Sequence, residues 1–248
     1  MQPKIAIVVP CYNEFTRLPK TEFKKFLGNF PNAHICFVND ASDDDTLNLL
    51  NGFSIDFPNQ VSVLSNTGNL GKAASVQKGV LYCSKNQIAP VLGYLDADLA
   101  TSLEECYSYL DFLTAKKHFV FASRILKIGS VVERKFSRFL FGRIIATFIS
   151  NILEIKVYDT QCGCKVFKTE LTQIMFEKPF ISKWLFDVEL FSRMLGHFGK
   201  EAALEKMEEI PVKRWINRGE SKVRLSYFFR LWYDLYLIRK AHRDNVRL

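Results

Sequence analysis

The chain has 248 residues, and 34 Lys or Arg against 26 Asp or Glu give it a formal net charge of +8. Its hydrophobic fraction of 48% is sufficient for a packed core, which excludes a wholly disordered chain. We expect neither a signal peptide nor a transmembrane helix, because Arg143 interrupts the longest apolar run, residues 139–153.

Strands and helices alternate along the first half of the chain. Apolar or β-rich runs predict strands over residues 4–9, 34–40, 61–65, 91–98 and 119–123. Helices are expected between them, over about 20–29, 43–51, 72–85 and 102–116. This alternation predicts an α/β fold with a Rossmann-like, mostly parallel sheet flanked by helices.

The second half of the chain is more helical. It predicts a long helix over 134–153, a strand over 164–168, a helix near 184–196, a strand near 208–213 and a terminal helix near 225–243. No repeat or low-complexity linker separates the two halves. We therefore expect one domain over residues 1–248, with a basic helical C-terminal portion.

Positive charge is concentrated in two segments. Residues 115–145 and 211–248 each carry a net charge of +7, whereas the remainder carries −6. Both segments also hold large apolar and aromatic side chains, which suits a nucleic acid or an anionic membrane surface as partner. The alternative is two core helices with solvated basic faces.

Six cysteines are present, and without an export signal we expect them to be reduced thiols. Cys162 and Cys164 are too closely spaced for the paired pattern of a zinc site. A metal site in this sequence would therefore depend on carboxylates.

Two carboxylates follow the fourth predicted strand. Asp96 and Asp98 are one residue apart, and a divalent cation is the simplest way to offset their repulsion. Oxygen ligands favour Mg²⁺ or Mn²⁺, held by a few carboxylates and substrate phosphates. Asp40 adds an acid at the same sheet edge, where such folds bind ligands. The alternatives are a helix N-terminal acid cluster for the pair and a turn aspartate for Asp40.

Other nucleotide-binding motifs are absent from the sequence. Segment 66–72 has two glycines, but it matches neither the Rossmann dinucleotide motif nor the P-loop motif. Lys72 at a predicted helix start is placed to meet a diphosphate, or else is a solvated lysine of the first turn.

Four motifs in order resemble the family 2 glycosyltransferases of the GT-A fold: VPCYNE (9–14), VNDASDDDT (38–46), NLGK (69–72) and DAD (96–98). Later segments look most like the dolichyl/polyprenyl-phosphate β-glucosyltransferase branch: DTQCGCKVF (159–167), WLFDVEL (184–190), IPV (210–212) and SKV (221–223). The resemblance divides the domain into a nucleotide-sugar-binding half (1–125), an acceptor-side half (126–224) and an amphipathic C-terminal helix (225–248).

The resemblance also implies roles for individual residues. Those implied for the nucleotide sugar are Pro10, Tyr12, Asn13, Glu14, Asp40, Asn69, Lys72, Asp96, Ala97 and Asp98. The metal would be held by Asp96 and Asp98. Those implied for the acceptor phosphate are Arg124, Ser137, Arg138 and Lys165. The catalytic carboxylates would be Asp98, Asp159 and Asp187.

The implied reaction moves a hexose, glucose by this resemblance, from a UDP-sugar to a polyprenyl or dolichyl phosphate with inversion. A phosphate acceptor is already ionised and needs guanidinium groups to position it, whereas a hydroxyl acceptor needs a base such as Asp187 or Asp159. One alternative is transfer to a saccharide hydroxyl in cell-surface polysaccharide synthesis. Another is a GDP-mannose-dependent polyprenyl-phosphate mannosyltransferase, although Ala100 stands where mannosyl relatives tend to have Gln.

A lipid acceptor has to be reached at a membrane. We expect helices 134–153 and 225–243 to lie on the cytoplasmic leaflet, so that the protein is cytoplasmic and peripherally membrane-associated. Lipid phosphate explains the basic segments better than nucleic acid does, and no nucleic-acid partner is expected. The competing interpretation of the apolar helix faces is a homo-oligomer interface. The competing class of function is a non-catalytic binding module.

Overall fold

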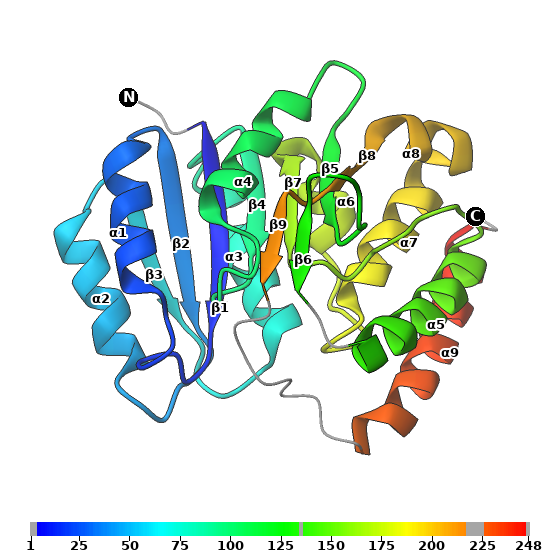
Figure 1. Ribbon diagram of the computed structural model, residues 1–248, viewed down its shortest axis with the longest axis horizontal. Helices are drawn as coiled ribbons and strands as arrows, with labels where there is room; N and C mark the ends of the chain where they lie inside the picture. Colours follow the sequence, from blue (N-terminus) through cyan, green and yellow to red (C-terminus); the bar gives the residue numbers. More distant parts are fainter. Residues whose placement is uncertain (1–3, 134–135, 217–225, 247–248) are drawn as a thin grey trace.

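The computed structural model describes residues 4–133, 136–216 and 226–246, without the side chains of 136–138, 226–229 and 243–246. Figure 1 shows its central sheet of seven strands in the order β3-β2-β1-β4-β7-β5-β8. The strands are β1 (Ile5–Cys11), β2 (Ala33–Asn39), β3 (Val61–Ser65), β4 (Val91–Leu95), β5 (Phe119–Ser123), β7 (Cys164–Lys168) and β8 (Met207–Pro211).

Most neighbouring strands in this sheet are parallel. β7 is the exception, because it runs antiparallel to both β4 and β5, with Tyr94 opposite Lys165 and Phe121 also opposite Lys165. The predicted mostly parallel α/β sheet is therefore confirmed. Strands from the second half of the chain extend the same sheet that the first half begins.

Helices cover both faces of the sheet, and a hydrophobic core lies on each. One core packs α1 (Lys20–Asn29), α2 (Thr46–Asp56) and α4 (Leu103–Ser108) against the sheet. The other packs α3 (Lys72–Lys85), α6 (Thr172–Phe176) and α7 (Phe186–Phe198). Gly79 lets α3 lie close to the sheet, because a Cβ at this position would overlap Val8 and Val38. Burial on both faces explains why β1 and β2 read as continuous apolar runs.

Two long helices lie side by side at one end of the molecule (Figure 1). They are α5 (Phe136–Leu153) and α9 (Ser226–Val246), and the rings of Phe148 and Trp232 meet edge-to-face at 4.8 Å. α9 also packs on α7, which is followed by the short helix α8 (Lys200–Lys206). No helix in the described part of the chain is both long enough and apolar enough to span a membrane.

Several predicted boundaries differ from the structure. The second helix begins at Thr46 rather than residue 43, because the Asp44 carboxylate accepts hydrogen bonds from the backbone N–H groups of Phe15 and Thr46. The fourth helix ends at Ser108 and continues only as the 3₁₀ turn η1 (Tyr109–Phe112), with another such turn, η2 (Thr169–Leu171), before α6. The strands β6 (Val131–Glu133) and β9 (Arg214–Ile216) were not predicted, since three residues give no periodic signal.

Candidate functional site

The candidate site lies where β1, β2 and β4 end. These strands are parallel neighbours, so their carboxyl ends meet at one edge of the sheet, the lower edge in Figure 1. The loops that begin with Pro10, Asp40 and Asp96 therefore emerge together, as the sequence predicts. Pro10 itself is half-buried near the end of β1.

The first two of these loops are joined by hydrogen bonds. Asn13 adopts a left-handed conformation (φ 53°), its N–H donates to Ser42 Oγ at 3.0 Å, and its Oδ1 accepts from Asp43 N at 2.9 Å. The N–H of Glu14 donates to Thr46 Oγ1 at 2.8 Å. Tyr12 Oη donates to Asp43 at 3.3 Å. These contacts give the 10–14 loop a defined shape and leave Tyr12 and Asn13 half-buried.

Asp40 organises the third loop, residues 66–71. Its Oδ1 accepts from Asn66 Nδ2 at 2.7 Å and from Leu70 N at 2.9 Å, and its Oδ2 accepts from Gly71 N at 2.8 Å. Only 3% of Asp40 is exposed. Asp40 therefore fixes the loop that carries Asn69, which is exposed, and that leads into Lys72. Its hydrogen bonds hold this turn in shape, and the nucleotide role implied by the resemblance stays a prediction.

Lys72 and Asp96 form the central ion pair of the site. Lys72 Nζ lies 2.5 Å from Asp96 Oδ1. Asp96 N donates to the carbonyl of Gly163 at 3.0 Å, and the Asp96 carboxylate fills the space that a Cβ on Gly163 would need. The Asp96 carboxylate thus packs directly against the backbone of Gly163. The Asp96 side chain retains 39% exposure, so it is accessible to a ligand.

Asp98 adds a second carboxylate next to the pair. Burial raises its pKa, and the charge of Asp96 raises it further, against a hydrogen bond from Ala100 N at 3.0 Å. Ala97 between the two acids is buried and points away into the core. The charges of Lys72 and Arg17 offset the burial and the like-charge repulsion only in part, so a bound cation would stabilise the ionised Asp98 further.

Asp187 lies beneath the site at the start of α7. It accepts hydrogen bonds from Tyr94 Oη and from Lys165 Nζ, the latter at 2.5 Å, and is 3% exposed. Lys165 has no exposed surface and also donates to the carbonyl of Cys162 at 2.9 Å. Burial and the neighbouring Asp187 charge together raise the pKa of Tyr94. The buried Lys165–Asp187 ion pair, which also accepts a hydrogen bond from Tyr94, therefore packs beneath the site.

Arg124 and Asp159 form another ion pair, with fork geometry. Arg124 Nε and Nη2 donate to the two Asp159 oxygens at 2.6 and 2.9 Å, and Arg124 N adds a third bond at 3.1 Å. Burial would raise the pKa of Asp159, but the Arg124 charge and hydrogen bonds outweigh it and lower the pKa to about 2. Paired in this way with Arg124, Asp159 is a weak base toward a substrate proton.

The residues implied for the acceptor separate in the structure. Arg124 lies at the end of β5, whereas Lys165 is sealed in the core, so Lys165 does not line an accessible phosphate site as predicted. Lys165 is buried because it pairs with Tyr94 in the sheet and its side chain contacts Asp187 in the core. Ser137 and Arg138 belong to the first turn of α5, and their side chains lie outside the described residues.

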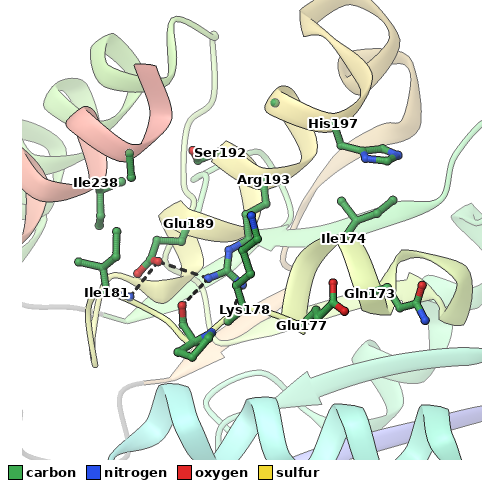
Figure 2. A pocket seen from close by; sticks show the side chains of 13 residues that line it. Gln173, Ile174, Glu177, Lys178, Ile181, Glu189, Ser192, Arg193, His197 and Ile238 are labelled. Carbon is green, nitrogen blue, oxygen red and sulfur yellow. Dashed lines mark hydrogen bonds and ion pairs between the residues drawn. The ribbon is translucent and has the colours of Figure 1, made fainter. Parts of the chain in front are cut away.

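A cavity of about 620 Å³ lies elsewhere, between α6, α7 and α9. Figure 2 shows Arg193 and Glu189 at its centre. Arg193 donates to the carbonyls of Met175, Lys178 and Pro179 at 2.7–2.8 Å, so its guanidinium holds the α6–α7 loop in place. This cavity lies apart from Lys72, Asp96 and Asp98, none of which lines it.

The family comparison covers the strands and loops that build the site. The family model described as "Glycosyl transferase family 2" matches residues 6–175. The chain belongs to this family. It is therefore a glycosyltransferase, as the motif order predicts.

Relatives and solved structures agree with this family 2 assignment. The chain is 30% identical, over 99% of its length and 76% of the relative's, to the dolichyl-phosphate beta-glucosyltransferase ALG5D of Trichomonas vaginalis. It is 27% identical, over 98% of its length and 78% of the relative's, to the dolichyl-phosphate beta-glucosyltransferase of Saccharomyces cerevisiae. Glucosyl-3-phosphoglycerate synthase from Mycobacterium tuberculosis, solved with Mn²⁺, UDP-glucose and phosphoglyceric acid, superposes with a TM-score of 0.65 at 13% identity. That match covers 97% of this chain and 79% of the other, and it shows a shared GT-A fold.

Three residues of this family 2 glycosyltransferase were not singled out by the sequence. Gly163 seats Asp96, Tyr94 braces Asp187, and Glu209 accepts hydrogen bonds from the backbone of Tyr158 and Asp159 at 3.1 and 2.8 Å. Of these three residues, only Gly163 could have been found from the sequence, because it lies within the motif DTQCGCKVF (159–167). The cysteines themselves are all buried and free, and burial raises the pKa of Cys162 to about 12.

Proposed function

We propose that this glycosyltransferase transfers glucose from UDP-glucose to a polyprenyl or dolichyl phosphate. The observation that carries the proposal is the Lys72–Asp96 contact of 2.5 Å beside Asp98, at the sheet edge where α/β folds bind nucleotides. The named activity of the relatives supports glucose as the sugar and a lipid phosphate as the acceptor. We further propose that residues 1–248 act as one domain, because β7 and β8 complete the sheet begun by β1.

Mg²⁺ or Mn²⁺ fits the two carboxylates of the site. Within the described residues, no group of three or more His, Cys, Asp or Glu side chains is close enough to hold a metal. Asp96 and Asp98 would therefore share the ion with the donor phosphates and water, which is a usual arrangement for Mg²⁺. When bound, such an ion stabilises negative charge on the leaving diphosphate.

The proposed reaction needs no general base. An oxygen of the acceptor phosphate forms a bond to the anomeric carbon while the bond from that carbon to the diphosphate breaks, releasing UDP. The attacking monoester is largely ionised near neutral pH, since its second pKa is about 6. Attack opposite the leaving group inverts the anomeric carbon. Lys72 would place its positive charge beside the departing diphosphate.

The paired state of the other carboxylates supports a phosphate acceptor over a hydroxyl acceptor. A hydroxyl must lose a proton to a base. Asp159 is bound by Arg124, which keeps its pKa at about 2, and Asp187 is bound by buried Lys165. Arg124, at the end of β5 and 22% exposed, is our candidate to attract the acceptor phosphate, together with Ser137 and Arg138.

The lipid acceptor would be met on a membrane surface by α5 and α9. On α5, Leu140, Ile144 and Phe148 recur every four residues and are 46–53% exposed. On α9, Tyr233 and Tyr236 are each 61% exposed. Exposed Arg230, Arg239 and Lys240 on the same helix add charges that anionic headgroups attract by about 1 kcal/mol each. We propose peripheral association through these two helices, at the cytoplasmic leaflet.

A partition assay tests the function. Purified protein would be incubated with polyprenyl phosphate, Mn²⁺ and either radiolabelled UDP-glucose or GDP-mannose. We expect a chloroform-soluble labelled product with UDP-glucose, lost when Mn²⁺ is chelated. If labelled lipid formed only from GDP-mannose, the donor would be GDP-mannose and the UDP-glucose assignment would be wrong. Label that enters water-soluble saccharide but never lipid would refute the acceptor.

A further inference from the structure

The loop between α6 and α7 brings Lys183 to the donor edge of the sheet. A Cβ built on Gly71 would meet Cδ, Cβ and Cγ of Lys183 at 3.2, 3.5 and 3.5 Å. The methylene groups of Lys183 therefore lie across the backbone of the residue that precedes Lys72. Gly71 has φ +92°, a conformation that favours glycine, so both its backbone and its missing side chain suit this crossing.

The position of Lys183 is fixed by buried hydrogen bonds. Glu189 accepts from the N–H groups of Ile181 and Ser182 at 3.0 and 2.9 Å, and Figure 2 shows the first of these bonds. Ser182 Oγ donates to Asp234 of α9 at 2.6 Å and accepts from the N–H groups of Trp184 and Leu185 at 3.3 and 3.0 Å. Ser182, Glu189 and Asp234 are each at most 4% exposed. Lys183 is thus an exposed side chain on a rigid backbone.

The ammonium group of Lys183 differs from that of Lys72. Lys72 Nζ is already paired with Asp96, and its surroundings include the further negative charges of Asp187 and Asp98. Lys183 Nζ has no hydrogen-bond or ion-pair partner among the described residues, and the side chain is exposed. The diphosphate of a nucleotide sugar carries more than one negative charge, and Lys72 already shares its charge with Asp96. An uncommitted cation next to Lys72 is what such a ligand needs.

We propose that Lys183 is a further donor-binding residue, whose ammonium group binds the diphosphate of the nucleotide sugar from the side of Gly71. This inference rests on the proposed function, because it takes the sheet edge at Asp96 and Asp98 to be the donor site. Lys183 and Lys72 then hold the diphosphate between cations carried by different loops. The alternative role for Lys183 is packing alone, with its methylene groups covering Gly71.

Binding of UDP and of uridine separates the two roles. Lys183→Met keeps the methylene packing over Gly71 and removes the charge, whereas Lys183→Arg keeps a charge. Lys178→Met removes an exposed lysine from the same loop and is the matched control. Affinities would be measured by titration calorimetry with Mn²⁺ present, using UDP and uridine as the probes.

We expect Lys183→Met to weaken UDP binding about 5- to 10-fold, between the value of an exposed ion pair and that of a hydrogen bond to a charged group, and to leave uridine affinity unchanged. Lys183→Arg should retain most of the UDP affinity, and Lys178→Met should bind UDP within about twofold of the unmodified protein. Equal UDP affinity in Lys183→Met and the unmodified protein would overturn the inference, as would a parallel loss of UDP and uridine binding. If the unmodified protein did not bind UDP, the proposed function would fail first.

Discussion

The carboxylate of Asp96 rests directly on the backbone of Gly163, 67 residues later in the chain, where a methyl group would overlap it. The same carboxylate contacts Lys72 at 2.5 Å. One backbone position in the second half of the chain thus determines where Asp96, from the first half, lies. The two halves are joined at the proposed reaction centre itself.

Gly163→Ala is therefore expected to displace Asp96 and to lower turnover by about 10- to 100-fold, the loss typical of a misplaced reacting group. Turnover would be followed by the lipid partition assay. Gly28→Ala, in α1 with open space around its Cβ position, is the control and should retain activity. Full activity in Gly163→Ala would contradict the role given to this contact.

Asp98→Asn keeps the side-chain shape and removes one of the two carboxylate charges. We expect a loss of turnover of at least about 100-fold, and UDP affinity that no longer responds to Mn²⁺. Titration of UDP with and without Mn²⁺ measures the second effect. Asp56→Asn, which removes only an exposed ion pair with Lys24, should change neither quantity. An unchanged response to Mn²⁺ in Asp98→Asn would exclude Asp98 as a metal ligand.

Lys165→Met should destabilise the protein by about 3–5 kcal/mol, because it leaves Asp187 buried without its cation. Denaturant unfolding measures the change. The double variant Lys165→Met with Asp187→Asn should recover much of this loss, since no unpaired charge then remains buried. A single variant as stable as the unmodified protein would show that Asp187 does not depend on Lys165.

The Arg124–Asp159 pair predicts a specific loss of stability in acid. The folded-state pKa of Asp159 is about 2, below the ordinary value of 3.8, so the pair stabilises the fold fully above about pH 4. This contribution, about 2 kcal/mol, is lost as the pH falls from about 4 to about 2, where the folded state takes up the proton. Unfolding curves of Asp159→Asn should lack this part of the pH dependence. Identical slopes for both proteins below pH 4 would refute it.

Membrane association should depend on Leu140, Ile144 and Phe148, the exposed apolar side chains that recur every four residues on α5. Replacing both Ile144 and Phe148 with Ser should reduce co-sedimentation with vesicles containing phosphatidylserine at low salt, because two exposed apolar groups are lost. Leu47→Ser, an exposed apolar position on α2 far from α5, is the control. High salt should weaken binding of every form of the protein. Equal sedimentation of the double variant would assign binding to another surface.

Local patterns predicted the strands of the fold well. The runs 61–65, 119–123 and 164–168 are strands with the predicted bounds, since apolar β-rich segments between polar turns need no long-range information. The antiparallel placement of β7 between β4 and β5 was not predicted. It depends on register with residues some 70 positions away, such as Tyr94 opposite Lys165.

The site was predicted as a set of residues rather than as a set of contacts. The positions of Lys72, Asp96 and Asp98 follow from the ends of parallel strands, and the structure brings them together. The burial of Lys165 could not be predicted, because a lysine inside a strand reads as exposed until its partner Asp187 is known. The hydrogen bonds of Asp40 could not be predicted either, since all three donors lie in residues 66–71, which the sequence does not place beside it.

The Ser182–Asp234 hydrogen bond joins α9 to the loop that carries Lys183. Asp234 belongs to α9, one of the two helices proposed to rest on the bilayer, and Ser182 adjoins the lysine that crosses Gly71. If α9 rests on the bilayer as proposed, a movement of this helix would be passed to the Lys183 loop by this hydrogen bond and by the packing of α9 on α7. The proposed membrane surface and the proposed donor site thus share a buried polar contact.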